Sequence, residues 1–71
     1  MKTKPIKAPL KVHDRIVQVK YALHETMTVF KIDEADPDRV YLMRENGVAL
    51  QGSQSAELLR DFDYQLITEG E

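Results

Sequence analysis

The chain has 71 residues, of which 42% are hydrophobic, and its net charge is −2. A chain of this length forms one domain with a limited core, because it buries only about 60% of the surface that its unfolded form exposes. It contains no cysteine, so disulfides and thiolate metal sites are excluded. The two histidines, His13 and His24, lack the close spacing of metal ligands. We therefore expect no metal and no cofactor.

The sequence contains no signal for a membrane or for secretion. No apolar run approaches the roughly 20 residues that a membrane-spanning helix needs. The lysines near the start are not followed by the apolar stretch of a secretory signal. We therefore expect a cytoplasmic protein that does not contact a membrane.

Charge is distributed unevenly along the chain. Residues 1–11 contain four lysines and no acidic residue, whereas the rest of the chain carries six basic and twelve acidic side chains. Prolines at positions 5 and 9 interrupt this basic segment, and each removes a backbone donor. The sequence predicts a flexible basic arm over residues 1–9, a single domain over 10–68 and a frayed terminus over 69–71. The arm is either a solvated tail or a contact for an acidic partner.

The first half of the domain is predicted to contain three strands. Residues 10–21 form the first strand, with a turn or bulge at 13–16, because the apolar residues alternate in opposite phase on its two sides. Residues 27–33 are rich in β-branched and aromatic side chains and form the second strand. A polar turn over 33–38 leads to the third strand at 39–44.

The Asn-Gly pair at 46–47 predicts a hairpin to a fourth strand over 48–51. A two-residue loop would place Met43 opposite Leu50, and a three-residue loop would place Leu42 opposite Leu50. We favour the three-residue loop, because it puts glycine at a left-handed position and gathers aliphatic side chains on one face. Those side chains are Val40, Leu42, Val48 and Leu50.

A short helix and a last strand complete the predicted elements. Serines before residue 56 are suitable N-caps for a helical segment over 56–62. Leu58, Leu59 and Phe62 share a face by their spacing and are expected to cover the sheet. Residues 64–68 form the fifth strand.

Two segments resemble known proteins. LKVHDRIVQVK (10–20) and MTVFKID (27–33) resemble the opening strands of SH3-like barrels of the KOW type. Members of that family often begin with an apolar-x-apolar-Gly-Asp-x-Val pattern, and His13 stands where they prefer glycine. The resemblance covers about residues 10–67. It implies a mainly β fold, a small five-stranded antiparallel SH3-like barrel with one short helical turn before the last strand. It carries over no functional residue.

No catalytic arrangement is evident in the sequence. There is no G-x-S-x-G motif and no Ser-His-acid set. The acidic cluster over 33–38 lacks the glycine and the final glutamate of a calcium-binding loop, so we interpret it as a solvated turn. Domains this small rarely enclose a substrate pocket. We therefore do not expect an enzyme.

The outer face of the third strand is a candidate interface. The favoured register turns Tyr41 and Met43 outward beside an arginine, and these residue types are enriched in protein interfaces. Alternatively, the helix over 56–62 covers this patch. The candidate partner-binding residues, including those of the basic segment, are Lys4, Lys7, Lys11, Arg15, Arg39, Tyr41 and Met43.

The sequence predicts a non-enzymatic protein-binding module, a monomer or weak dimer, that attaches to and modulates a larger complex. A concrete form would be a phage- or mobile-element-type regulator that inhibits a host machine such as RNA polymerase. One alternative is a KOW-like nucleic-acid-binding module, in which lysines follow phosphates and Tyr21 or Tyr41 stacks on bases. The other is a structural component that self-assembles through an exposed strand edge.

Overall fold

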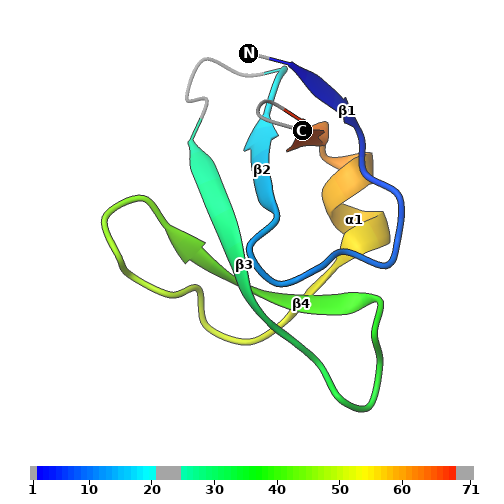
Figure 1. The fold of residues 1–71 in the computed structure, drawn as a ribbon, viewed down its shortest axis with the longest axis vertical. Helices are drawn as coiled ribbons and strands as arrows, with labels where there is room; N and C mark the ends of the chain where they lie inside the picture. The colour runs from blue at the N-terminus through cyan, green and yellow to red at the C-terminus, as the bar shows by residue number, and fades with distance from the viewer. Residues whose placement is uncertain (1, 21–24, 69–71) are drawn as a thin grey trace.

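The chain forms one antiparallel β-sheet and one short helix in a computed structural model that describes residues 2–20 and 25–68 (Figure 1). The elements in chain order are β1 (Thr3–Pro5), β2 (Arg15–Gln18), β3 (Thr26–Ile32), β4 (Arg39–Arg44), β5 (Gln54–Ser55), α1 (Ala56–Asp61) and β6 (Tyr64–Ile67). The strand order in the sheet is β1-β6-β2-β3-β4-β5. The predicted mainly β, antiparallel fold is confirmed.

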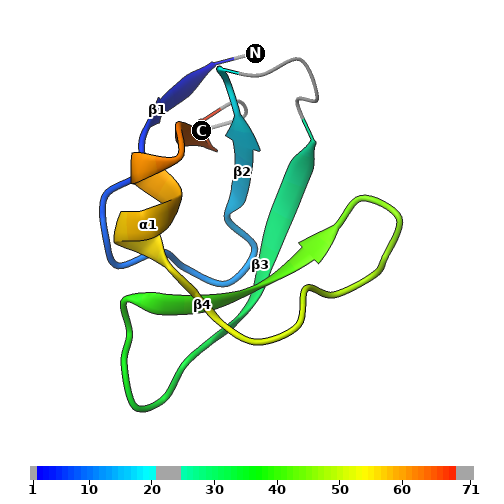
Figure 2. The ribbon, with the colours of Figure 1, turned by 180° about the vertical axis from the view of Figure 1, so that it is seen from behind.

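Two finer predictions about the sheet are wrong. The part of the chain that the structure describes contains six strands rather than five, and the barrel is not closed, because β1 and β5 are both edge strands. The register shifts between Val29 and Lys31, and such a bulge increases the local twist. Figures 1 and 2 show β4 turning across β3 at this point. Both edges are short, and Pro5 removes a donor from β1, which disfavours assembly through strand edges.

The N-terminal segment belongs to the sheet. β1 pairs with β6, and the Thr68 backbone N–H donates to the Lys2 carbonyl at 2.9 Å. Ile6, the next residue after β1, is only 3% exposed and lies in the core with Leu10. The expectation that order begins at Leu10 is therefore wrong. Burial of Ile6 ties the segment to the domain, and an edge position tolerates the proline that follows Lys4.

The change of phase predicted near 13–16 is a tight turn that precedes β2. The Asp14 backbone N–H donates to the Lys11 carbonyl at 3.0 Å, and the Lys11 N–H donates to Asp14 Oδ2 at 2.8 Å. His13 has a φ of +80° within this turn. The His13 N–H and the Asp14 carbonyl bond to the Val29 backbone at 2.8 Å each, which fixes the turn to β3. As a consequence, β2 begins at Arg15 rather than at residue 10.

Replacing His13 by glycine is expected to raise the free energy of unfolding by about 0.5–1 kcal/mol. A left-handed backbone costs an ordinary residue about 1–2 kcal/mol, and the greater freedom of unfolded glycine cancels part of that gain. Urea denaturation followed by circular dichroism measures the change. His13→Ala is the control. Alanine has a Cβ, so the positive φ is as unfavourable for it as for histidine, and this variant should not be more stable than the wild type. A stability of His13→Gly below that of the wild type would show that the imidazole itself stabilises the turn.

The favoured register of the hairpin after β4 is confirmed. The Arg44 N–H donates to the Val48 carbonyl at 2.9 Å, and the Leu50 N–H donates to the Leu42 carbonyl at 2.9 Å. The loop therefore has three residues, and Gly47 adopts a φ of +85°. This conformation favours glycine because it has no Cβ.

The fourth strand is misplaced in the prediction. The segment 48–51 makes only an isolated bridge between Met43 and Ala49, and β5 pairs instead with the beginning of β4. The reason is burial: Val48 is 57% exposed, so the hairpin end extends beyond the core and little apolar contact holds a longer strand there. Leu50 still packs against the core.

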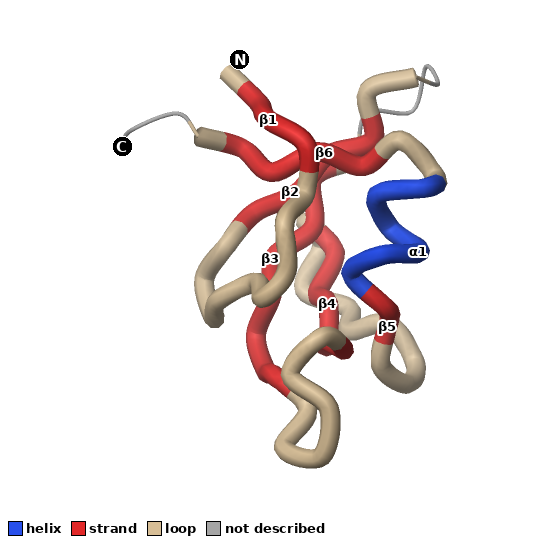
Figure 3. The backbone as a smooth tube through the Cα atoms, turned by 90° about the vertical axis from the view of Figure 1, so that its right-hand side faces the viewer, coloured by secondary structure: helices blue, strands red, loops and turns tan. Residues whose placement is uncertain are grey.

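The core lies between the sheet and α1. Figure 3 shows α1 directly after β5 and alongside the sheet. The buried residues of the core cluster are Ile6, Leu10, Ile16, Met27, Val29, Val40, Leu42, Ala56 and Leu59.

The helix covers the core with Leu59, as predicted, but not with Leu58 or Phe62. Ser55 caps α1, because its side chain accepts the Leu58 N–H at 3.4 Å. Ala56 and Leu59 are buried, whereas Leu58 and Phe62 are 48% and 57% exposed. Ala56 and Leu59 are three residues apart and face the core, so Leu58 and Phe62, four apart, lie on an adjacent stripe. No helix among the described residues is long and apolar enough to span a membrane.

Candidate functional site

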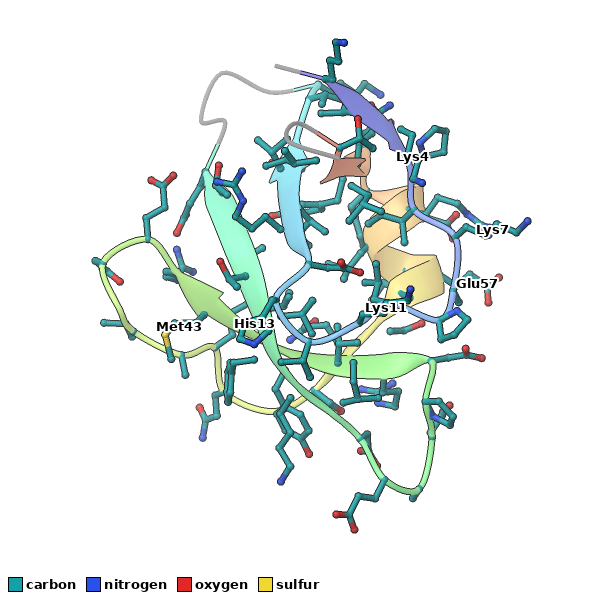
Figure 4. All side chains as sticks on the ribbon, viewed as in Figure 1. Lys4, Lys7, Lys11, His13, Met43 and Glu57 are labelled. Carbon is teal, nitrogen blue, oxygen red and sulfur yellow. The ribbon has the colours of Figure 1, made fainter. Side chains whose placement is uncertain are left out.

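Three of the predicted partner-binding lysines line one groove. Lys4, Lys7 and Lys11 surround a groove of about 260 Å³, which we call the lysine groove. Its remaining lining residues are Ala8, Pro9, Leu10, Asp14 and Leu66. Figure 4 shows the three lysines on the same side of the molecule, along the N-terminal segment. The structure thus gathers two side chains that the sequence placed on a separate arm, Lys4 and Lys7, with one from the start of the predicted domain, Lys11.

Two buried residues with three exposed residues between them position the N-terminal segment that carries these lysines. Ile6 and Leu10 are each 3% exposed, and Lys7, between them, is exposed. Lys4 is held on β1, where it pairs with Leu66 of β6. Anchoring the two apolar side chains in the core therefore holds the intervening backbone against the domain, so the ammonium groups stay outside.

The lysine groove carries an excess of positive charge. None of its three lysines takes part in a salt bridge within the described ranges, 2–20 and 25–68. Asp14 is the one acidic lining residue within residues 2–20 and 25–68, and its Oδ2 accepts the Lys11 backbone N–H at 2.8 Å. The three ammonium groups are therefore available to an anionic ligand.

A second groove of opposite charge adjoins the first. It measures about 450 Å³ and shares Ala8 with the lysine groove; we call it the acidic groove. Its charged lining residues are three acids and one base, Asp36, Asp38, Glu57 and Arg60, and Arg60 Nη2 lies 3.9 Å from Glu57 Oε1. Asp36 Oδ1 accepts the Asp38 N–H at 3.1 Å, so this carboxylate also stabilises its own turn. Among the described residues, no group of three acidic or histidine side chains could hold a metal ion.

The outer face of the sheet brings together other predicted residues. Arg15 pairs with Thr28, and Thr28 pairs with Met43, so the three lie in one row across β2, β3 and β4. Side chains paired in this way point to the same face of a sheet.

An aromatic pair extends this outer face. The rings of Phe30 and Tyr41 lie 6.2 Å apart between centroids, and Lys31 Nζ lies 5.4 Å from the Tyr41 ring centroid. Val40 and Leu42, which alternate with Tyr41 along β4, are buried in the core on the side that α1 covers. The helix therefore does not cover this patch.

Two hydrogen bonds to Ser53 hold the Arg39 side chain against the loop before β5. Its Nε donates to Ser53 Oγ at 2.8 Å, and its Nη2 donates to the Ser53 carbonyl at 2.9 Å. Arg39 is partly buried, and it positions the loop that leads to β5. These bonds give the residue a structural role beside the binding role that the sequence suggested.

The helix presents an apolar surface that the sequence interpretation missed. Leu58 and Phe62, which we call the helix face, border a groove of about 330 Å³. The other lining residues of this groove are Gln18, Met27, Leu50, Gln54, Leu59 and Tyr64. The spacing of Leu58 and Phe62 was visible in the sequence, but the choice of which stripe faces the core depends on how α1 is placed between β5 and β6.

Searches of protein-family models, of curated proteins and of solved structures found no match to this chain. Tyr21 and His24, two residues considered for stacking and for metal binding, lie outside the described residues. The surfaces that the structure does describe offer ammonium groups, aliphatic side chains and an aromatic pair. Of these groups, aromatic side chains are enriched in protein interfaces, and ammonium groups bind anionic ligands.

Proposed function

We propose that this protein is a non-enzymatic module that binds a protein partner and modulates the larger complex to which the partner belongs. The helix face carries the proposal. Leu58 and Phe62 are exposed together beside an apolar groove, although burying a side chain of this size contributes about 1.5–3 kcal/mol. A protein partner that covers both side chains would recover this free energy, whereas a phosphate backbone would not.

A small regulator of a host machine such as RNA polymerase, of the phage or mobile-element type, is the concrete form of this proposal. The size of the domain supports it, as does the presence of charged grooves and an apolar face on one small surface. The twisted sheet with a helical turn before its last strand supports an SH3-like relationship. Such a regulator would act in the cytoplasm.

Replacing both Leu58 and Phe62 by serine is expected to reduce capture of the partner at least about tenfold in chemical cross-linking on a lysate of the source cells. The loss of two exposed apolar anchors is the physical reason, since a few such residues carry most of the affinity of an interface. The amount of the captured protein, measured by quantitative mass spectrometry, tests the expectation.

Val12→Ser with Val48→Ser is the matched control. These valines are 43% and 57% exposed, and they line neither the lysine groove nor the groove beside the helix face. The control should capture the partner as well as the wild type does. Equal capture by the Leu58/Phe62 variant and the wild type would refute the proposal. So would a wild type that enriches no protein over a parallel sample of the lysate to which no bait protein is added.

A nucleic-acid-binding module is the second candidate. The observation that favours it is the Phe30–Tyr41 pair with Lys31 over the Tyr41 ring, because bases stack on aromatic rings beside cations. The acidic excess outside the first eleven residues disfavours it, since a binding domain of this class presents a basic face. A titration with single-stranded RNA decides: no affinity even at low ionic strength eliminates this function.

A further inference from the structure

We infer that the lysine groove binds an acidic segment of a protein, with carboxylates on Lys4, Lys7 and Lys11 and an aliphatic side chain against Pro9 and Leu66. This inference rests on the proposed function in taking a protein as the ligand. It concerns a different surface, because the lysine groove and the groove beside the helix face share no lining residue.

Electrostatics indicates the charge of the ligand. Three lysines line one small groove, and Asp14, the only acidic lining residue in the part of the chain that the structure describes, already accepts a backbone hydrogen bond. Like charges gathered around one groove repel one another, and an anionic ligand relieves the repulsion. The acidic remainder of the chain repels a polyanion at longer range, so the attraction is confined to a short anionic segment.

The apolar part of the groove indicates what else the ligand carries. Ala8, Pro9, Leu10 and Leu66 contribute aliphatic surface between the lysines. A protein segment can place one aliphatic side chain on this surface while its carboxylates reach the ammonium groups. No aromatic residue among those that the structure describes lines the groove, so these residues offer no stacking platform for single-stranded nucleic acid.

The adjoining acidic groove distinguishes the two classes of ligand further. A nucleic acid carries a negative charge at every phosphate, so a strand that continued past Ala8 would meet three carboxylates and one guanidinium, those of Asp36, Asp38, Glu57 and Arg60, and the balance is repulsive. A protein segment avoids this repulsion, because its acidic run can stop at Ala8. The arrangement therefore selects a short acidic peptide over a polyanion.

The triple variant Lys4→Gln, Lys7→Gln and Lys11→Gln tests the inference. The probe is a fluorescein-labelled peptide of glutamates around one leucine, and a peptide with glutamines in place of glutamates is its control. We expect the wild type to bind the acidic peptide, with an affinity that falls as salt is added. The triple variant should bind about tenfold more weakly or worse, because each exposed ion pair contributes up to about fivefold.

Arg15→Gln with Lys20→Gln and Lys31→Gln removes the same charge outside the groove and should change the affinity by less than about twofold. An equal loss in both triple variants would refute the inference, as would a wild type that prefers the glutamine peptide or binds neither. Tighter binding of a single-stranded oligonucleotide of equal charge would assign the groove to nucleic acid and refute it too.

The Leu58→Ser/Phe62→Ser variant should bind the acidic peptide as the wild type does, so the two proposals fail separately. Capture of the partner by this variant at the wild-type level, with peptide binding intact, would refute only the helix-face function. A wild type that captures the partner but does not bind the acidic peptide would refute only the inference about the lysine groove. Urea denaturation of every variant confirms that the compared proteins are folded.

Discussion

Replacing Ile6 by alanine is expected to lower the free energy of unfolding by about 2–4 kcal/mol. Ile6 is 3% exposed and belongs to the core cluster, although it lies in a segment of lysines and prolines that looks like a tail. Deleting its outer carbons removes buried apolar surface and leaves a cavity. Since a domain of this size has only about 5 kcal/mol of stability to lose, urea denaturation should show a large shift of the midpoint.

Lys7→Ala is the matched control for this variant, because Lys7 is the exposed neighbour of Ile6. It should change the stability by less than about 0.5 kcal/mol. If Ile6→Ala also stayed within that limit, residues 1–9 would lie outside the cooperative fold. The sequence alone suggests that outcome, and the pairing of β1 with β6 contradicts it.

Leu42→Ala is expected to cost about 3–5 kcal/mol and to leave much of the protein unfolded at 25 °C. Leu42 is 0% exposed, and it lies in β4 between the core residues of β3 and the hairpin residue Leu50. The side chain is among the largest that the core buries completely, so little nearby structure can move to fill the space. Calorimetry or urea denaturation measures the loss.

Leu42→Met keeps most of the side-chain volume and should lower the free energy of unfolding by less than about 1.5 kcal/mol. This variant keeps the role of position 42 measurable if the alanine variant fails to fold. Val48→Ala serves as a control on the same hairpin, since Val48 is 57% exposed, and it should stay within about 0.5 kcal/mol. Equal losses at positions 42 and 48 would contradict the exposed position of Val48 at the end of the hairpin.

Elements that depend on local patterns could be predicted from the sequence. β3, β4, α1 and β6 lie within one or two residues of their predicted ranges, because β-branched runs and a serine cap are local signals. The hairpin register was also predictable, because only glycine readily adopts the positive φ found at Gly47. The turn before β2 was visible as a change of alternation, although its position was not.

The parts of the fold that depend on distant pairing could not be predicted. β1 is stabilised by β6 at the other end of the chain and by one buried isoleucine, a signal too small to outweigh two prolines and four lysines. The lysine groove exists only because of that pairing, since Leu66 of β6 supplies part of its wall. The sequence could therefore name Lys4, Lys7 and Lys11 as candidates but could not show that they line a single groove.

The pairing of β1 with β6 also decides how the domain responds to mechanical force. Lys2 and Thr68 lie side by side at one end of this antiparallel pair, joined by a hydrogen bond of 2.9 Å. Tension applied to the two ends of the chain loads the hydrogen bonds between β1 and β6 one after another, as in a zipper, instead of shearing them together. The first step of forced extension is therefore the peeling of β1, which takes Ile6 out of the core at low force.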